Sequence, residues 1–146
     1  MIVKVKKLDA RAILPTYGSP QAAGADLYAL LEGESLTIAA GETVLIPTGL
    51  SVEIPEGYVG LIYARSGLAT KKGLAPANKV GVIDADYRGE VKVALYNQSG
   101  KEQTILAGER IAQFVIAPYM TAQFEESDEL SETSRGAGGF GSTGNK

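Results

Sequence analysis

A chain of 146 residues with a formal charge of −3 at pH 7 is long enough for one domain with its own buried core. The acidic balance argues against nonspecific nucleic-acid binding, which relies on a basic patch or stripe. No Cys, His or Trp occurs, so disulfides, thiolate nucleophiles, imidazole metal ligands and serine–histidine catalysis are excluded, and carboxylates must perform any acid–base chemistry.

Short apolar or alternating runs recur along the chain and predict β-strands. They cover residues 2–8, 34–38, 43–46, 50–54, 58–63, 91–96 and 111–116. In residues 50–54 and 91–95 the apolar side chains occupy every second position, which is the period of a strand with one buried face. Turns rich in Gly and Pro separate the runs, and many short strands with this spacing predict an all-β sandwich or barrel.

Helices and membrane segments have little support in the sequence. Only residues 67–72 and the acidic stretch 125–132 allow a short helix, and neither has clear helical periodicity. Residues 1–8 are too short and too charged for a signal peptide, and no apolar run approaches the roughly 20 residues of a transmembrane helix. We therefore expect a soluble, cytoplasmic protein that binds neither membranes nor nucleic acid.

Residues 81–89 concentrate reactive side chains between two strand-like runs. Asp84, Asp86, Tyr87 and Arg88 lie there, and glycines at both ends permit tight turns. The pattern predicts a hairpin that carries catalytic or binding groups. A plain polar turn explains the segment equally well, because Asp, Tyr and Gly are common hairpin residues.

Two further segments contain polar residues beside predicted strands. Asp26, set among small residues, is either a turn cap or an outer carboxylate for a hydrated metal ion, and the only catalytic metal that this composition suits is a hard ion such as magnesium. Arg65, Ser66 and Gly67 follow the strand at 58–63, where they could open a short helix whose amides face an anion. An Arg at the end of a strand usually contacts only solvent, so the simpler interpretation remains.

Asn78 and Gln113 each have two interpretations. Asn78 is either a turn former or a group that reads the edge of a nucleotide base. Gln113 shares a strand face with apolar Ile111 and Val115, so its amide must find either an internal hydrogen-bond partner or a ligand.

The C-terminal residues 135–144 contain five glycines around Phe140. Such a segment cannot order itself by burying a core, which predicts a mobile terminus. Alternatively, glycine amides with Arg135, Ser142 and Thr143 could wrap phosphates while Phe140 stacks on a base. The segment is not a Walker P-loop, which would place a Lys before the Ser or Thr.

Taken together, five segments in this order resemble the trimeric dUTP pyrophosphatase family, known as dUTPase. They are AGADLYA at 23–29, ARSGLA at 64–69, the segment from 78 through GVIDADYRGE to 90, GERIAQ at 108–113 and RGAGGFGSTG at 135–144. The resemblance implies a jelly-roll β-barrel that forms a homotrimer with active sites shared between subunits. It divides the chain into a domain of residues 1–134 and a mobile glycine-rich tail of residues 135–146 that closes over the active site.

The resemblance also implies a reaction and the groups that perform it. The family hydrolyses dUTP to dUMP and pyrophosphate with magnesium, which limits uracil incorporation into DNA and supplies dUMP for thymidylate synthesis. Asp84 would activate the attacking water, and Asp86 is the weaker candidate because spacing alone does not choose between them. Tyr87 would stack under the deoxyribose and exclude ribonucleotides.

The remaining roles implied by the resemblance concern the base and the phosphates. The backbone from Val82 through Ile83 to Asp84, with Asn78 and main chain near Lys92, would form the uracil slot. Asp26 would touch magnesium through water. Residues implied to bind the phosphates are Arg65, Ser66, Gly67, Arg135, Gly141, Ser142 and Thr143. Gln113 would reach the phosphates or the attacking water, and Phe140 would stack on uracil.

Two other functions compete with this interpretation. A dCTP deaminase shares the fold but uses a Glu near the hairpin as its base, and a noncatalytic protein could retain the nucleotide pocket for regulation. Asp84 in an Ile-Asp-x-x-Tyr setting, together with the glycine-rich tail, favours the pyrophosphatase.

Overall fold

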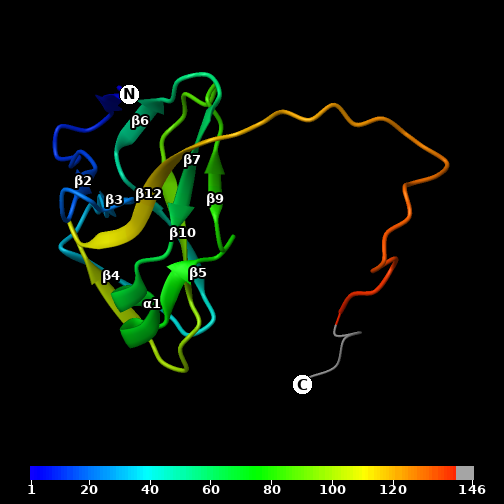
Figure 1. The fold of residues 1–146 in the computed structure, drawn as a ribbon. Coiled ribbons are helices and arrows are strands. Elements are labelled where there is room, and N and C mark those ends of the chain that lie inside the picture. The colour runs from blue at the N-terminus through cyan, green and yellow to red at the C-terminus, as the bar shows by residue number, and fades with distance from the viewer. Residues whose placement is uncertain (141–146) are drawn as a thin grey trace.

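The computed structural model describes residues 1–140, and its regular structure is almost entirely β (Figure 1). The predicted all-β class is therefore confirmed. In chain order the described elements are β1 (Lys4–Lys7), β2 (Thr16–Tyr17), β3 (Ala25–Tyr28), β4 (Ser35–Ile38), β5 (Thr43–Pro47), β6 (Leu50–Glu53), β7 (Tyr58–Tyr63), α1 (Ser66–Lys72), β8 (Leu74–Pro76), β9 (Gly81–Ile83), β10 (Lys92–Asn97), β11 (Gln103–Leu106) and β12 (Arg110–Pro118).

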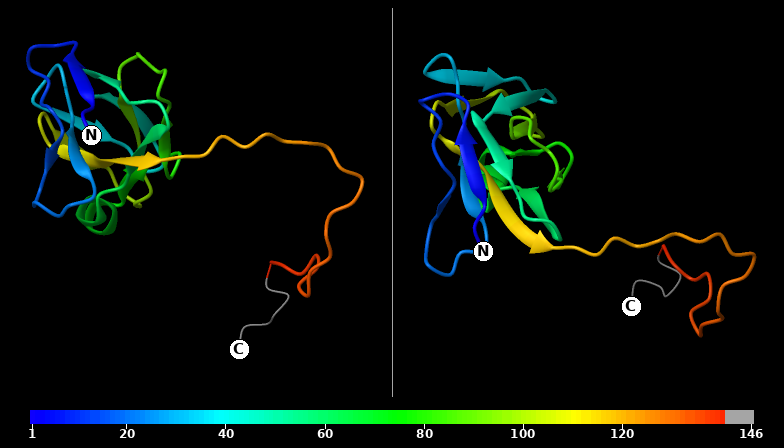
Figure 2. Two further views of the ribbon diagram at one scale, coloured as in Figure 1. Left: turned by 45° about the horizontal axis from the view of Figure 1, so that its top comes forward. Right: turned by 90° about the horizontal axis from the view of Figure 1, so that it is seen from above.

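The described strands form four antiparallel sheets that wrap around one apolar core. The largest sheet has the order β2-β3-β12-β7-β9, and a second has the order β5-β10-β8. The pairs β1-β6 and β11-β4 complete the body, which Figure 2 shows as a rounded unit. Leu27, Ile46, Leu95 and Ile111, from four different strands, are at most 1% exposed and belong to the same core cluster.

Every strand predicted from an apolar or alternating run is present, with its ends moved by a few residues at most. Strand β10 shows why the pattern was informative, because its side chains alternate between exposed or half-buried and fully buried along the whole strand. Strands β2, β3, β8, β9 and β11 were not predicted. Three of them are only two or three residues long, and β3 is buried on both faces, so it lacks the alternation.

Of the two segments that allowed a helix, only the first forms one. Helix α1 begins at Ser66, buries Leu68 and ends before Gly73, whose φ of 67° is the left-handed conformation that closes many helices. Residues 125–132 form no helix. No helix within residues 1–140 is long and apolar enough to cross a membrane.

The chain leaves the body after Pro118, the last residue of β12. From there to residue 140 it forms no strand or helix, and Figures 1 and 2 show it running away from the sheets. The side chains of Met120, Phe124 and Leu130 are each at least 89% exposed on this segment. The described residues of a single copy therefore leave these apolar groups without a surface to pack against.

Candidate active site

A slot opens between β9 and β10, which lie next to each other in space but belong to different sheets. Strand β9 pairs with β7, whereas β10 pairs with β5 and β8. The slot has a volume of about 140 Å³, and its lining includes Asn78, Gly81 and Val82 on one side and Lys92 and Ala94 on the other. The hairpin predicted at residues 81–89 is therefore wrong, because the strands on either side of this segment do not pair with each other.

The missing strand pairing gives the slot two free backbone edges. Strand β9 is hydrogen-bonded on one side only, and within β10 the first two residues, Lys92 and Val93, pair only with β5. A strand paired on one side leaves N–H and C=O groups free on its other side. A flat heterocycle that enters the slot therefore meets main-chain donors and acceptors.

Asn78 reaches the slot through a tight turn that follows β8. Lys79 has a φ of 65°, and the N–H of Val80 donates to the C=O of Asn78 at 2.7 Å. The turn folds the Asn78 amide back over Gly81, where an added Cβ would lie 3.3 Å from Asn78 Nδ2. The predicted position of Asn78 beside the segment 81–89 is thus found, and glycine at position 81 leaves room for it.

A second cavity of about 280 Å³ continues from the slot and contains the reactive side chains. It is lined by Leu45, Val82, Ile83, Asp84, Tyr87, Glu90 and Lys92, four of which also line the slot. Asp84 and Asp86 are both exposed, but only Asp84 lines this cavity. The structure therefore separates two carboxylates that spacing alone could not distinguish. Leu45 and Glu90 were not among the predicted site residues.

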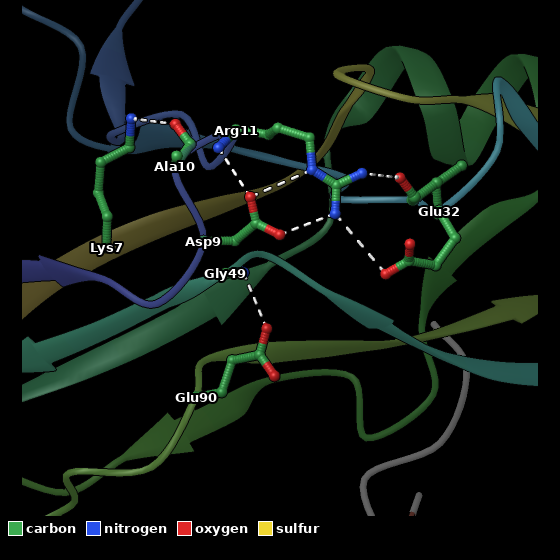
Figure 3. Close-up of polar contacts among 8 residues, drawn as sticks. Lys7, Asp9, Ala10, Arg11, Glu32, Gly49 and Glu90 are labelled. Carbon is green, nitrogen blue, oxygen red and sulfur yellow. Dashed lines mark hydrogen bonds and ion pairs between the residues drawn. The ribbon is translucent and has the colours of Figure 1, made fainter.

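The loop from 84 to 91 is tied firmly to the turn between β5 and β6 and to the first residues of β6. The N–H of Gly49 donates to Glu90 Oε1 at 2.8 Å, a contact visible in Figure 3, and Ser51 Oγ donates to the C=O of Arg88 at 2.8 Å. The N–H of Val91 donates to the C=O of Leu50, also at 2.8 Å. These contacts hold the loop in place without the pairing that a hairpin would provide.

A cationic cluster forms at a different edge of the molecule, across three strands of the largest sheet. Asp26 on β3 faces Gln113 on β12, and Gln113 in turn faces Tyr63 at the end of β7. This register brings the next turn of chain, with Arg65, to Asp26. Asp26, Arg65 and Gln113, which are far apart in sequence, thus meet at one place, and the sequence had not predicted this contact.

Two guanidinium groups share the Asp26 carboxylate. Arg65 Nε donates to Oδ1 at 2.8 Å and Arg110 Nη1 donates to Oδ2 at 3.2 Å, while the Asp26 side chain is only 11% exposed. One negative and two positive charges leave a net positive group, which provides the local charge that an acidic protein needs to hold a polyanion. Arg110 is a functional candidate that sequence reasoning missed, since its partner lies 84 residues away.

Three other predicted phosphate ligands lie beside this cluster. Gln113 Nε2 donates to the C=O of Ala64 at 3.4 Å, which places its amide next to the residue before Arg65. Ser66 and Gly67 open helix α1 and are exposed. Gly24 packs against Gln113, because an added Cβ there would lie 2.9 Å from its Oε1.

The tail residues are not brought to either group. Within residues 1–140, Arg135 Nε donates only to the C=O of Gly138, at 2.8 Å, and Phe140 is fully exposed on the segment that runs away from the body. The predicted phosphate ligands Gly141, Ser142 and Thr143 lie outside the described residues. A single copy of the chain therefore shows the slot and the cationic cluster, but not the closure predicted for the tail.

The arrangement of the acidic residues bears on magnesium binding. No group of three or more acidic side chains within residues 1–140 is arranged to hold a metal ion. Both oxygens of Asp26 accept from arginines, yet a carboxylate can accept about four hydrogen bonds, so a water can still bind there. This donor set fits an ion that arrives with phosphates and keeps its water, as magnesium commonly does.

A further cavity of about 340 Å³ contains none of the predicted site residues. It lies beside Arg11, Tyr28 and Glu32. The Arg11 guanidinium is already paired with Asp9, with Glu32 and with the C=O of Leu31 (Figure 3). The Arg11 charge is therefore already neutralised and is not available to a ligand in this cavity.

An all-β domain with a backbone-lined slot, an adjoining carboxylate and a separate cationic cluster defines a protein suited to a phosphorylated, ring-containing ligand. The comparisons identify the family. The dUTPase family model matches residues 10–144, and the chain belongs to the dUTPase family.

Curated relatives and solved structures agree with this assignment. The deoxyuridine 5'-triphosphate nucleotidohydrolase of Nautilia profundicola is 51% identical over 144 residues, covering 99% of each chain, and that of Desulfitobacterium hafniense is 52% identical over 147 residues, covering 97% of each. Among solved structures, a mutant dUTPase of Staphylococcus bacteriophage 80alpha with dUpNHpp superposes with a TM-score of 0.87, at 30% identity and 98% coverage of both chains. A phage phi11 dUTPase mutant, described with a structural Mg(II) ion, gives a TM-score of 0.78 at 27% identity, covering 89% of this chain and 99% of that one.

Proposed function

We propose that this chain hydrolyses dUTP to dUMP and pyrophosphate. The observation that carries the proposal is the cavity in which Asp84 and Tyr87 adjoin the slot between β9 and β10. A carboxylate, an aromatic ring and a backbone-lined slot are the groups needed to activate water, hold a sugar and select a base. By consuming dUTP and producing dUMP, the reaction limits uracil incorporation into DNA and supplies the precursor of thymidylate.

The slot selects uracil. Uracil hydrogen-bonds to the free backbone of residues 82–84, to main chain near Lys92 and to Asn78, in the manner of a base-pairing partner. Thymine is rejected because a base held by the backbone on both sides of the slot has no space for a methyl group on its ring. Cytosine presents the opposite donor and acceptor pattern at one edge, which leaves buried polar groups unpaired and costs several kcal/mol.

Tyr87 and Asp84 act on the next two parts of the substrate. The Tyr87 ring stacks under the deoxyribose and occupies the space that a 2'-hydroxyl would need. Asp84 accepts a proton from a water molecule whose oxygen attacks the α phosphorus. The bond between this phosphorus and the bridging oxygen breaks, and pyrophosphate leaves with the bridging oxygen.

The phosphates are bound by residues from two regions. Arg65, Ser66, Gly67 and Gln113 hold the phosphate chain from the cationic cluster and helix α1. The tail, residues 135–146, closes over the nucleotide as a segment separate from the domain of residues 1–134. Its contacts are Phe140 on uracil and Arg135, Gly141, Ser142 and Thr143 on the β and γ phosphates.

We further propose that the active enzyme is a homotrimer with sites shared between subunits. Two observations support this: the cationic cluster and the cavity with Asp84 have no lining residue in common, and the tail of one copy lies away from both. The exposed apolar groups of residues 119–130 offer contacts to a neighbouring copy. Each site then combines a slot, a cationic cluster and a tail from different chains.

Magnesium fits this arrangement as an ion held by the triphosphate, with Asp26 reaching it through water. When bound, it neutralises charge on the phosphate oxygens. Asp26 also keeps Arg65 and Arg110 in position, so the carboxylate contributes to phosphate binding whether or not metal is present.

The decisive experiment is pyrophosphate release from dUTP compared with dTTP, dCTP and UTP. We expect dUTP to be preferred by at least about a hundredfold in kcat/KM over each competitor, because each breaks a different contact. Equal rates for all four nucleotides would refute uracil and sugar selection. A parallel assay for ammonia from dCTP tests deamination, for which Glu90 is poorly placed, because its carboxylate already accepts from Gly49 and pairs with Lys92.

A further inference from the structure

The Tyr87 side chain folds back over the residues that follow it. Tyr87 Oη donates to the C=O of Glu90 at 3.0 Å. The ring crosses Gly89 so closely that an added Cβ would lie 2.5 Å from Tyr87 Cζ and 2.8 Å from Cε2, distances that real Cβ atoms essentially never show. The ring can therefore lie in this position only because residue 89 has no side chain.

The backbone beneath the ring cannot easily give way. The C=O of Arg88 accepts from Ser51 Oγ, and the Glu90 carboxylate accepts from the N–H of Gly49 at 2.8 Å (Figure 3) and pairs with Lys92 at 3.4 Å. These contacts tie the residues on both sides of Gly89 to β6 and to the turn before it. A side chain at position 89 would therefore displace the Tyr87 ring and leave the loop in place.

We propose that Gly89 is a specificity-determining residue. By letting the Tyr87 ring lie directly on the main chain, it sets the position of the ring in the cavity and thereby the discrimination between deoxyribose and ribose. This rests on the proposed function, in which Tyr87 lies under the sugar. Ala at position 89 pushes the ring off the main chain and breaks its bond to Glu90, so the ring is no longer held in the space that a 2'-hydroxyl would need. Binding of the deoxyribose weakens, while Asp84 is left where it was.

Two other glycines, each in a different segment, also lie directly against the side chain of a proposed site residue. Gly81 adjoins the Asn78 amide and Gly24 adjoins the Gln113 side chain, at hypothetical Cβ distances of 3.3 Å and 2.9 Å. Gly89 makes the closest approach of the three. It also has no positive φ, so Ala at this position strains no backbone and tests the contact alone.

The experiment compares Gly89→Ala with Gly100→Ala, a matched control in which the new methyl group meets nothing within 4 Å. We expect Gly89→Ala to lower the ratio of kcat/KM for dUTP over UTP by about tenfold or more, through a higher KM for dUTP with kcat nearly unchanged. Gly100→Ala should match the parent. An unchanged ratio, or a loss confined to kcat, overturns the proposal.

A second measurement does not depend on catalysis. With ring-labelled tyrosine, the Tyr87 resonance is assigned by its loss in Tyr87→Phe, and we expect it to shift in Gly89→Ala but not in Gly100→Ala. If Gly89→Ala shifts the resonance while the parent fails to cleave dUTP, the proposed function fails and the contact stands. If the resonance does not move, Gly89 does not position the ring.

Discussion

The loop at residues 84–91 and the chain after Pro118 both contain predicted site residues, yet they are held in opposite ways. The loop has no regular structure, but hydrogen bonds donated by Gly49 and Ser51, and one accepted by the C=O of Leu50, fix it to the body. The segment 119–140 lies apart and, within the described residues, is bonded only to itself beyond Tyr119. The groups proposed to choose and cleave the substrate are thus built in advance, whereas those proposed to close over it are not.

This contrast has a physical reason. A general base and a base-selecting slot work only when held within a fraction of an ångström, so a preorganised loop favours catalysis. A closing segment must admit the substrate first, and a chain rich in glycine and poor in apolar groups stays free until a ligand or neighbouring copy offers contacts. The following variants test each half of the contrast.

The largest effect is expected at Asp84. Asp84→Asn keeps the size of the side chain but removes its ability to accept a proton, so we expect kcat to fall about 10³-fold. Binding of a nonhydrolysable dUTP analogue, measured by calorimetry, should stay within a few-fold of the parent. Asp86→Asn is the matched control, since Asp86 is equally exposed but does not line the cavity. A fast Asp84→Asn enzyme would remove the assigned role.

Deleting residues 135–146 tests the segment that is proposed to close over the substrate. We expect turnover of dUTP to fall about 10²-fold, because contacts that close over the phosphates are lost. The melting temperature should not change, since the body ends at Pro118. Unfolding of the truncated protein, or normal turnover, contradicts a closing tail.

Co-expressing the truncated chain with Asp84→Asn sharpens this result. Neither chain alone should be active, but a site that takes Asp84 from one copy and the tail from another is complete in the mixed assembly. Recovered activity therefore supports sites shared between subunits. Its absence, in assemblies shown by affinity tags to contain both chains, indicates that each tail serves its own cavity.

Sequence reasoning found the local part of the site and missed the part made by distant contacts. Asp84 and Tyr87 were identified because one short motif contains both. The shared carboxylate between Arg65 and Arg110 could not be predicted, since Asp26 meets Arg110 across 84 residues and only the strand register brings them together. Alternation likewise predicts a strand but not its partner, and for that reason a hairpin was expected where β9 and β10 join different sheets.

A smaller effect, on stability, compares a glycine of the body to which the loop is fixed with a glycine of the segment after Pro118. In Gly60→Ala the new Cβ would lie 2.5 Å from Phe114 Cε2 and 2.8 Å from Ile54 Cδ1, in the middle of β7. Such overpacking should lower the free energy of unfolding by about 1–3 kcal/mol. Gly139→Ala meets nothing within 4 Å and should change it by less than about 0.5 kcal/mol. Equal effects in urea denaturation would show that the two regions are not held differently.

The smallest effect is expected at Asp9, on the surface of the same fixed body. Hydrogen bonds from the Arg11 side chain and backbone lower the pKa of Asp9 from 3.8 to about 2 (Figure 3). A carboxyl whose pKa is lowered by folding stabilises the folded state above its unfolded pKa, and this contribution is lost as pH falls from about 4 toward 2. Asp9→Asn should therefore differ from the parent by a small, constant amount in unfolding free energy above pH 4, and the difference should shrink toward pH 2. Because the pair is exposed to solvent, added salt should reduce the difference further, and a difference that grows below pH 4 would contradict the assigned cause.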